Sequence, residues 1–358
     1  MYSPHAATSI TDASSLSMAE LKDAGTLIRL AYQSLKSLGI NAEKVLEDAD
    51  LDIDQLYNSK LRTPHWGQQV FWQAAETVSD DPLIGLKIGK RMPLFKSVVL
   101  EHLFISAQNY GEGLTRVLNY QRLISDAIDL TLHDDAGSDE VWLTFKYPNN
   151  DLRHLIDCSA MVLVQVMRTS SDGALLAKKI DICHDGADYR EEYERLLGCP
   201  INFGTDENRI YFEKSALAAR SLHNHPELLD FHTRCAEAQL EDLKRRDLIN
   251  DVRHQIGAML ETGDLTSETI ARALSMDAHD MVSRLREAGT SFSEILNDYR
   301  HHLSRKLLLA TDEPISEIVY LTGFSEPSTF YRAFKRWEGV TPVEFRKRYA
   351  KAEEGPDQ

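Results

Sequence analysis

The chain has 358 residues, of which 42% are hydrophobic and 27% are charged, and its formal net charge is −16. The composition is typical of a soluble globular protein, and the length predicts two domains. No apolar run reaches the roughly 20 residues of a membrane-spanning helix, and residues 1–20 lack the basic start and apolar core of a secretory signal. We therefore expect a cytoplasmic protein without membrane contact, whose polar tails at residues 1–20 and 351–358 are disordered.

From Leu21 to about Tyr120 the sequence pattern is mainly helical. In the segment QQVFWQAAETV, small and apolar residues recur at the spacing of one helix face. These residues are Val70, Phe71, Ala74, Ala75 and Val78. Pro82, Gly85, Gly89 and Pro93 follow, and this glycine and proline punctuation is expected to keep the helical segments short.

Strand patterns appear in the next part of the chain. Apolar and polar residues alternate on both sides of a polar, glycine-containing turn over residues 127–147, which predicts a β-hairpin. A helix is predicted over 152–169, a short strand over 179–185 and a second hairpin over 200–213. Residues 21–246 are therefore predicted to form an α+β domain, in which helices accompany a small, mostly antiparallel sheet.

Residues 247–350 differ, because they carry no strand pattern and are predicted to be all-α. Ser291 with Glu294, and Thr341 with Glu344, have the spacing of helix capping boxes. A long helix over residues 226–246 closes the preceding domain, which places the domain boundary at 246/247.

Two stretches of this second domain, residues 267–289 and 316–339, repeat one layout. Each predicts a short helix, a tight turn around a hydrophobic residue, and a second helix that ends at glycine, which is a helix-turn-helix motif. A predicted helix over residues 291–311 joins them and is about 30 Å long at 1.5 Å per residue. Major-groove faces on one side of B-DNA repeat every ~34–36 Å, so the two second helices could enter adjacent turns of the groove.

On a helical wheel, the second helix of each repeat has an apolar and a polar face. In the second repeat, Phe330, Ala333, Phe334 and Trp337 lie on the core side. The side chains opposite are the predicted DNA contacts, since Arg, Lys and hydroxyl groups bind base edges and phosphates. These contacts are His279, Ser283 and Arg286 in the first repeat, and Ser328, Thr329, Arg332, Lys335 and Arg336 in the second.

Charge is distributed unevenly along the chain. Residues 1–252 hold 26 basic and 39 acidic residues, whereas residues 253–358 hold 14 and 17. Within the second part, residues 328–348 hold six basic and two acidic residues. Phosphate binding depends on the field within a Debye length of ~8–10 Å, so this local positive region permits DNA binding by an acidic protein.

These motifs resemble a known family. The segments GTSFSEILNDYR and LLLATDEPISEIVYLTGFSEPSTFYRAFKRWEGVTPVEFR are similar to the C-terminal DNA-binding domain of AraC/XylS-type transcription regulators, and the resemblance covers residues 250–349. It implies a seven-helix domain that inserts two recognition helices into double-stranded promoter DNA, and we expect contact with RNA polymerase. The first repeat departs from the family pattern, with Asp277-Ala278-His279 and Ser283 where the family commonly carries Arg. We therefore expect the second repeat, with Arg332, to contribute more of the affinity.

Residues 60–235 resemble the N-terminal sensor domain of ornithine-utilisation-type AraC regulators. The resemblance rests on RTPHWGQQVFWQAAETVSDDPLIGLKIG, GLTRVLNYQRLISDAIDL and YERLLGCPINFGTDENRIYFE. It implies a domain that binds a small-molecule effector or mediates dimerisation, and we expect a homodimer. Two functions stay open: a regulator that responds to an effector, and an effector-independent regulator whose N-terminal domain only dimerises or contacts a protein partner.

The candidates for an effector site are aromatic residues near the predicted strands, together with two polar residues. An aromatic pocket suits an amphipathic effector, and Arg153 and His184 could anchor an effector's carboxylate. The alternative is that the aromatic residues fill the core, and that Arg153 and His184 are surface or structural residues. The candidates are Trp142, Phe145, Tyr147, Arg153, His184 and Tyr211.

Catalytic and cofactor-binding motifs are absent from the sequence. It has no G-x-S-x-G, P-loop or G-x-G-x-x-G motif, so no enzymatic activity and no cofactor are expected. His223, His225 and His232 lack a helical His pair or a Cys partner, so no metal site is expected. The four cysteines form no C-x-x-C pair, which favours reduced thiols, with a redox role for one of them as the alternative.

Overall fold

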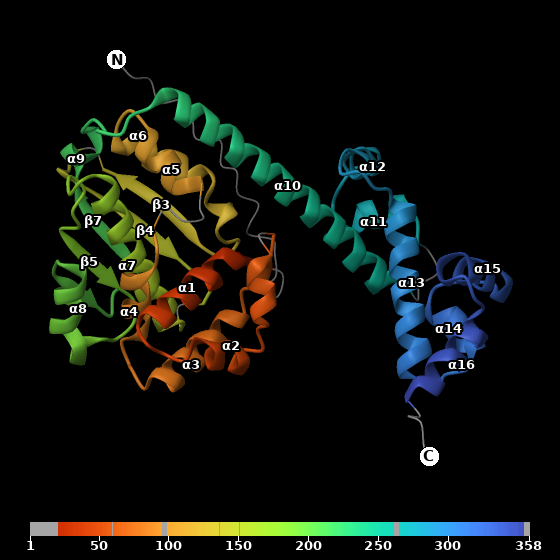
Figure 1. Cartoon of the computed structure of the whole chain (residues 1–358). Coiled ribbons are helices and arrows are strands. Elements are labelled where there is room, and N and C mark those ends of the chain that lie inside the picture. The colour runs from red at the N-terminus through yellow and green to blue at the C-terminus, as the bar shows by residue number, and fades with distance from the viewer. Residues whose placement is uncertain are drawn as a thin grey trace. The chain divides into compact units, whose positions relative to one another are not determined.

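The computed structural model describes residues 21–58, 60–94, 99–135, 137–149, 151–260 and 265–353, with side chains through residue 348 (Figure 1). The chain divides into two compact units, residues 1–240 and 241–358. The division falls inside helix α10, Pro226–Met259, whereas the sequence pattern placed the end of this helix at residue 246. The helix continues because no glycine or proline occurs between Glu227 and Ile256.

The N-terminal unit combines helices with two sheets. Its helices and 3₁₀ turns are α1 (Gly25–Ser37), α2 (Ala42–Asp48), η2 (Ile53–Tyr57), α3 (Gly67–Ser79), α4 (Ile84–Arg91), α5 (Val99–Ser106), α6 (Tyr110–Asn119), η3 (Gln121–Leu123), α7 (Arg153–Ser170), η4 (Ala187–Tyr189), α8 (Arg190–Leu197) and α9 (Lys214–Ala218). Strands β1 (Lys22–Ala24) and β2 (Arg62–Pro64) form a small antiparallel pair.

The main sheet has five strands in the order β3-β4-β7-β5-β6. They are β3 (Asp129–Asp134), β4 (Glu140–Lys146), β5 (Lys179–Ile182), β6 (Ile201–Phe203) and β7 (Arg209–Glu213). Strands β3 and β4 are the predicted first hairpin, and only the β5–β6 pair is parallel. The α+β fold with a mostly antiparallel sheet is therefore confirmed.

The predicted second hairpin is wrong, because β6 and β7 do not pair with each other. Strand β5 lies between them, parallel to β6 and antiparallel to β7. Ile180 and Ile182 of β5 are almost fully buried. A strand with such a buried apolar face gains more from a position inside the sheet than from an edge.

Helices α4 and α7 cover one face of the sheet (Figure 1), and their apolar residues join those of the strands in one core. Helix α4 is short, as predicted, and lies between Pro82 and Pro93, but Gly85 and Gly89 are inside it and do not end it. A Cβ on Gly85 would lie 2.4 Å from the His154 carbonyl oxygen, and one on Gly89 would lie 2.8 Å from the Cys158 carbonyl oxygen. Both glycines are therefore needed for the close approach of α4 to α7.

Helix α3 shows the predicted apolar stripe with one difference. Phe71, Ala74 and Ala75 are buried, but Val70 is 37% exposed. Trp72 is buried instead, and its indole N–H donates to Gln68 Oε1 at 3.0 Å.

The C-terminal unit is all-α beyond α10 among the described residues. Its helices are α11 (Ser267–Ala273), α12 (Ala278–Glu287), α13 (Phe292–Ala310), α14 (Ile315–Leu321), α15 (Pro327–Glu338) and α16 (Pro342–Glu353). Both predicted N-caps form, since Ser291 Oγ accepts from Glu294 N–H at 3.2 Å and Thr341 Oγ1 from Glu344 N–H at 3.3 Å. Among the described residues, the reciprocal bond that completes a capping box is found at Thr341, whose N–H donates to Glu344 Oε2 at 2.8 Å, and not at Ser291.

The connecting helix α13 serves two separate small cores. Its first part packs Ile295 against residues of α10, α11 and α12, and its last part packs Leu308 against α14, α15 and α16. Each helix-turn-helix repeat therefore has its own hydrophobic core.

Candidate nucleic-acid interface and apolar cavity

The turns of the two repeats have the same backbone geometry. Met276 N–H donates to the Ala271 carbonyl at 2.8 Å, and Phe324 N–H donates to the Val319 carbonyl at 3.0 Å. The preceding residue adopts a positive φ in both turns, 55° at Ser275 and 73° at Gly323. Glycine takes this conformation without the steric cost that a Cβ adds, so the first turn is the more strained of the two.

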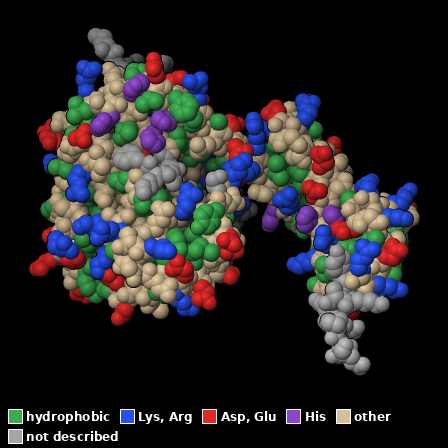
Figure 2. Space-filling view, in the orientation of Figure 1, with side chains coloured by type: hydrophobic (Ala, Val, Ile, Leu, Met, Phe, Trp, Pro, Cys, Tyr) green, Lys and Arg blue, Asp and Glu red, His purple; other side chains and the backbone are tan. Residues whose placement is uncertain are grey.

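Helix α15 presents a polar, basic face. Phe330, Ala333 and Phe334 are buried as predicted, and Trp337 is half-buried. The five predicted DNA contacts on this helix, Ser328, Thr329, Arg332, Lys335 and Arg336, are all exposed. Among the described residues none of the three cations is in an ion pair, and Arg332 Nη2 donates only to Thr329 Oγ1 at 3.4 Å. Figure 2 shows Lys and Arg side chains on the surface over α15.

Helix α12 presents a polar face of different charge. His279 and Arg286 are exposed, while Ser283 is half-buried and lies 3.5 Å from Glu287 Oε1. Arg284 is paired with Asp280 at 2.8 Å, one turn earlier on the same helix. The basic groups of α12 are thus partly neutralised within the helix.

Asp277 is the N-cap of α12. Its carboxylate accepts from the N–H groups of His279 at 2.9 Å and Asp280 at 3.1 Å. Such a cap typically stabilises a helix by about 1 kcal/mol. The capping of α12 therefore explains why an acidic residue occurs at this position of the first repeat.

Val282 on α12 was missed by the sequence analysis. It is 45% exposed and lies between His279 and Arg286 in sequence, one turn from each. An exposed apolar side chain on a recognition helix can contact the methyl group of thymine. The helical wheel gave a signal, because at 100° per residue Val282 falls within about 60° of His279 and Arg286, on the predicted DNA-binding face.

Polar contacts with α13 hold both the turn before α15 and the last turn of α15. Arg300 Nη2 donates to the Gly323 carbonyl at 2.6 Å, and its guanidinium lies 4.5 Å from the Phe324 ring centre. At the other end of α15, Glu338 accepts from His301 at 2.5 Å and pairs with Arg305 at 3.3 Å. Burial lowers the pKa of the Arg300 guanidinium from its usual value.

In the N-terminal unit, Trp142 and Tyr211 lie together on one face of the sheet. The Trp142 ring stacks on His133 with centroids 5.3 Å apart and lies 6.0 Å from Tyr211. Tyr211 donates to Asp181 Oδ2 at 2.8 Å, and Lys179 Nζ lies 4.1 Å from its ring centre. Phe145 points to the opposite face and is fully buried in the core.

Tyr147 is part of a separate contact. Its hydroxyl is 2.7 Å from Ser159 Oγ, and its ring stacks on His65 at 5.9 Å. Burial raises the pKa of the Tyr147 hydroxyl well above its usual value.

Arg153 and His184 converge on the buried carboxylate of Asp157. His184 Nε2 is 2.8 Å from Asp157 Oδ1, and Arg153 Nε is 3.8 Å from Oδ2. Tyr193 also donates to Oδ2 at 2.8 Å. The two side chains predicted to anchor an effector's carboxylate thus already have a carboxylate of the chain between them.

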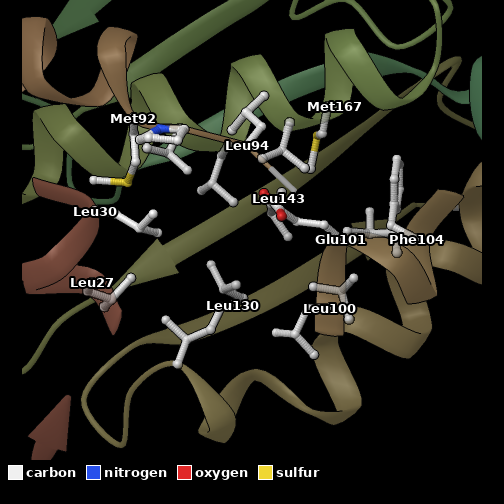
Figure 3. Close-up of a pocket in the computed structure, with 17 residues that line it drawn as sticks. Leu27, Leu30, Met92, Leu94, Leu100, Glu101, Phe104, Leu130, Leu143 and Met167 are labelled. Carbon is white, nitrogen blue, oxygen red and sulfur yellow. The ribbon is translucent and has the colours of Figure 1, made fainter. Parts of the chain in front are cut away.

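An apolar cavity of about 130 Å³ lies between α1, α5, α6, α7, the strands β3 and β4, and residues 92–94 (Figure 3). It has 17 lining residues, among them Leu30, Leu100, Phe104 and Leu143, and all but Glu101 are apolar. None of the six candidate effector residues lines it. Its walls come from elements spread over residues 27–167, so no local sequence pattern reveals it.

A second, polar hollow of about 430 Å³ lies between α3 and the start of α7. It is lined by Gln69, Gln73, Glu76 and Arg153, among others, and Arg153 is the one candidate effector residue found there. The six candidates therefore do not form one site, and each stays a prediction.

Neither a metal site nor a cysteine with a lowered thiol pKa is found among the described residues. Within them, no group of three His, Cys, Asp or Glu residues is arranged to hold a metal ion. The four cysteines are free, and burial raises the pKa of the Cys158 thiol to about 12 and of the Cys199 thiol to about 11, which disfavours reactive thiolates. The described part of the chain also contains no helix long and apolar enough to cross a bilayer.

Paired helix-turn-helix motifs beside an α+β unit define a DNA-binding transcription regulator with a separate sensor domain. Residues 39–221, more than half of the chain, match the model of the arabinose-binding domain of AraC transcription regulators, N-terminal part. Residues 270–348 match a helix-turn-helix domain. The chain belongs to the AraC family of transcription regulators, which confirms the resemblance noted in the sequence.

Known relatives extend over both units. The chain is 24% identical over 277 residues to the ornithine utilization regulator of Pseudomonas aeruginosa, covering 76% of this chain and 81% of that protein. It is 28% identical over 283 residues to an uncharacterized helix-turn-helix regulator of Mycobacterium tuberculosis, covering 75% and 80%. The crystal structure of the regulator CdpR from Pseudomonas aeruginosa aligns with a TM-score of 0.44 at 18% identity, covering 89% of this chain and 98% of that one.

Proposed function

We propose that this DNA-binding regulator is controlled by a small apolar effector that binds in the cavity of the N-terminal unit. The supporting observation is the cavity itself, about 130 Å³ in volume and lined by apolar side chains except for Glu101. An apolar cavity of about 150 Å³ in another protein stays dry and binds benzene. A cavity of this size therefore suits a ring or a chain of about six carbons.

On the DNA side, we propose that α15 enters the major groove as the main recognition helix and that α12 enters a neighbouring turn. The support is the exposed basic face of α15, where Arg332, Lys335 and Arg336 have no ion-pair partner among the described residues. In this proposal Arg332 binds a base edge, Lys335 and Arg336 bind phosphates, and Ser328 and Thr329 bind either. His279, Ser283 and Arg286 of α12 make the weaker set of contacts.

We propose that helix α10 transmits the structural change caused by effector binding to the helix-turn-helix repeats. Leu100 of α5 lines the cavity and also belongs to a buried cluster with Ala236 of α10. Further along α10, Val252 and Ile256 are buried in the core that holds α12. A ligand that shifts α5 would change the packing of α10, and α10 is one continuous helix.

The proposal also takes the regulator to act as a homodimer and to contact RNA polymerase at the promoter. Sedimentation of the full-length protein, with and without operator DNA, tests the dimer. A monomer under both conditions would overturn that part of the proposal and leave the effector site standing.

The cavity is tested by adding small apolar compounds to the full-length protein, beginning with benzene and n-hexanol. Binding is expected to raise the free energy of unfolding by about 2.7 kcal/mol at a concentration of 100 Kd. Val166→Phe, which places a ring in the cavity, is expected to abolish the effect. Leu176→Phe, at a side chain that is 55% exposed and outside the cavity lining, is the matched control.

A lack of stabilisation by every compound would overturn the effector site. The N-terminal unit would then serve only for dimerisation or for contact with a protein partner.

A further inference from the structure

Tyr331 lies at the edge of the polar face of α15, at the position that matches Val282 of α12. At ~100° per residue it falls about 40° from Lys335 and about 60° from Ser328, both of which are proposed DNA contacts. Val282 has the same angular relation to the matching contacts of the first repeat. Both recognition helices therefore carry an uncharged side chain at the same edge, and only that of α15 ends in a hydroxyl group.

The ring of Tyr331 is restrained, whereas its hydroxyl is left without a partner. The residue is half-buried, and its ring makes an edge-to-face contact with the fully buried Phe330, with centroids 6.0 Å apart and an interplanar angle of 83°. Among the described residues the hydroxyl has no hydrogen-bond partner, and it is not one of the buried polar atoms. A tyrosine hydroxyl donates and accepts hydrogen bonds, so this one is available to a group outside the chain.

The place of Tyr331 on the helix indicates which part of DNA it meets. When α15 lies in the major groove, side chains at the centre of the polar face, such as Arg332, point to the base edges, and those at its margins face the sugar-phosphate walls. About half to two-thirds of protein–DNA hydrogen bonds go to phosphate and sugar, and tyrosine is among their donors. The O–H of Tyr331 is thus matched to a phosphate oxygen, which is an acceptor.

We propose that Tyr331 donates a hydrogen bond to one phosphate of the operator and thereby helps to fix the register of α15 in the groove. The inference rests on the proposal that α15 is the main recognition helix. Because the ring is already packed on Phe330 and has few rotatable bonds, little side-chain entropy is lost when the contact forms. Tyr331 adds an uncharged contact beside the cationic contacts of Lys335 and Arg336.

The test measures the operator affinity of the full-length wild type and of Tyr331→Phe at several salt concentrations, by fluorescence anisotropy on an operator selected in vitro. This variant keeps the ring and removes only the hydroxyl, so we expect binding to weaken about tenfold at every salt concentration. The slope of log K against log salt concentration should stay unchanged, because a neutral donor releases no counterion. Lys335→Ala, in contrast, should reduce this slope.

A second measurement locates the phosphate. Single phosphates of the operator are replaced in turn by neutral methylphosphonate, and both proteins are measured on each duplex. At one position the tenfold difference between wild type and Tyr331→Phe should fall to less than about threefold, because the charged acceptor is gone. Tyr299→Phe is the matched control: its hydroxyl lies against α10, 2.6 Å from where a Cβ on Gly257 would be, and its loss should change neither affinity nor slope.

The outcomes separate this inference from the proposal on which it rests. The phosphate contact is overturned if Tyr331→Phe binds like the wild type, if its loss is confined to some base-pair variants of the operator, or if no methylphosphonate reduces the difference. A slope reduced by about 1 would overturn it as well. If Arg332→Ala and Lys335→Ala also bind like the wild type, α15 is not a recognition helix and the proposed function itself fails.

Discussion

The two helix-turn-helix repeats have the same backbone arrangement in their turns, but they differ in the charge of their exposed faces and in the residues of their cores. The same backbone hydrogen bond forms in both turns, and in both repeats a glycine follows within two residues of the end of the second helix. At five matching positions, α12 has His279, Asp280, Ser283, Arg286 and Glu287, where α15 has Ser328, Thr329, Arg332, Lys335 and Arg336. The formal charge of these positions is −1 on α12 and +3 on α15.

The cores differ as well. The first repeat is filled by Ile270, Met281 and Leu285, whereas the second is filled by phenylalanines, with Phe334 in edge-to-face contact with Phe345 at 5.3 Å. The motif thus requires only the turn geometry and some apolar filling. The charge on the exposed face is independent of the fold, so one repeat can lose its basic face without losing its structure.

The largest expected effect concerns the separate cores. Phe334→Ala should destabilise the second repeat by about 3–5 kcal/mol, because a fully buried aromatic ring is replaced by a cavity. Amide hydrogen exchange should show lost protection in α14–α16 and retained protection in α11 and α12. Leu285→Ala should give the reverse pattern, and equal loss in both repeats would show that they share one core.

The next effect concerns the ranking of the two recognition helices. Arg332→Ala should cost about 1–3 kcal/mol in affinity for an operator selected in vitro, and should relax base preference at one position. Ser283→Ala should cost much less, since this side chain is half-buried and bonded to Glu287. Fluorescence anisotropy on operator variants measures both.

Two results would contradict this ranking. Equal losses for the two variants would refute the greater role of α15. A loss for Arg332→Ala that is uniform over all operator variants would make Arg332 a phosphate contact.

A smaller effect is expected in the salt dependence. Lys335→Ala and Arg336→Ala should each reduce the slope of log K against log salt concentration by about 1, because each removes one phosphate contact. Glu287→Arg, at the position that matches Arg336, should raise this slope by about 1, because it would add one phosphate contact. Arg284→Ala is the control, because Arg284 is paired with Asp280; a slope change as large as that of Lys335→Ala would show that its charge reaches DNA.

The smallest expected effect belongs to Val282. If the methyl groups of Val282 contact a thymine, replacing that thymine by uracil should weaken DNA binding by the wild type by about 0.8 kcal/mol, the value of one buried methyl group. Val282→Ala should remove this sensitivity. A scan in which no thymine-to-uracil change affects the wild type would exclude the contact.

Local sequence patterns predicted the DNA-binding unit better than the N-terminal unit, and the reason is the range of the interactions. The N-caps at Ser291 and Thr341 and the apolar face of Phe330 and Phe334 depend on residues within one or two turns. The prediction of a second hairpin was wrong because the pairing of β5 with β6 and β7 depends on burial across the whole sheet.

The candidate sites show the same division. The wheel found the exposed side chains of α15, because the residues that bury one face also expose the other. The effector candidates were chosen for being aromatic or basic near strands. The i,i+4 spacing of Arg153 and Asp157 on the predicted helix already indicated one of the contacts, whereas the contact of His184 with Asp157 joins residues that are far apart in the sequence and has no such signal. The apolar cavity likewise has no signature, since leucines that line a cavity and leucines that fill a core are identical in sequence.

The contacts of Arg300 and Glu338 have a consequence for the entropy of DNA binding. Arg300 fixes the turn before α15, and Glu338 fixes its last turn, so both ends of this helix are held on α13 before DNA arrives. For α12, the polar contacts found among the described residues stay within the helix and its cap. Ordering a flexible side chain at an interface costs about 0.5–1.5 kcal/mol, and a recognition helix that is ordered during folding avoids part of this cost on binding. Helix α15 is thus pre-organised as well as basic, and both properties favour the same repeat.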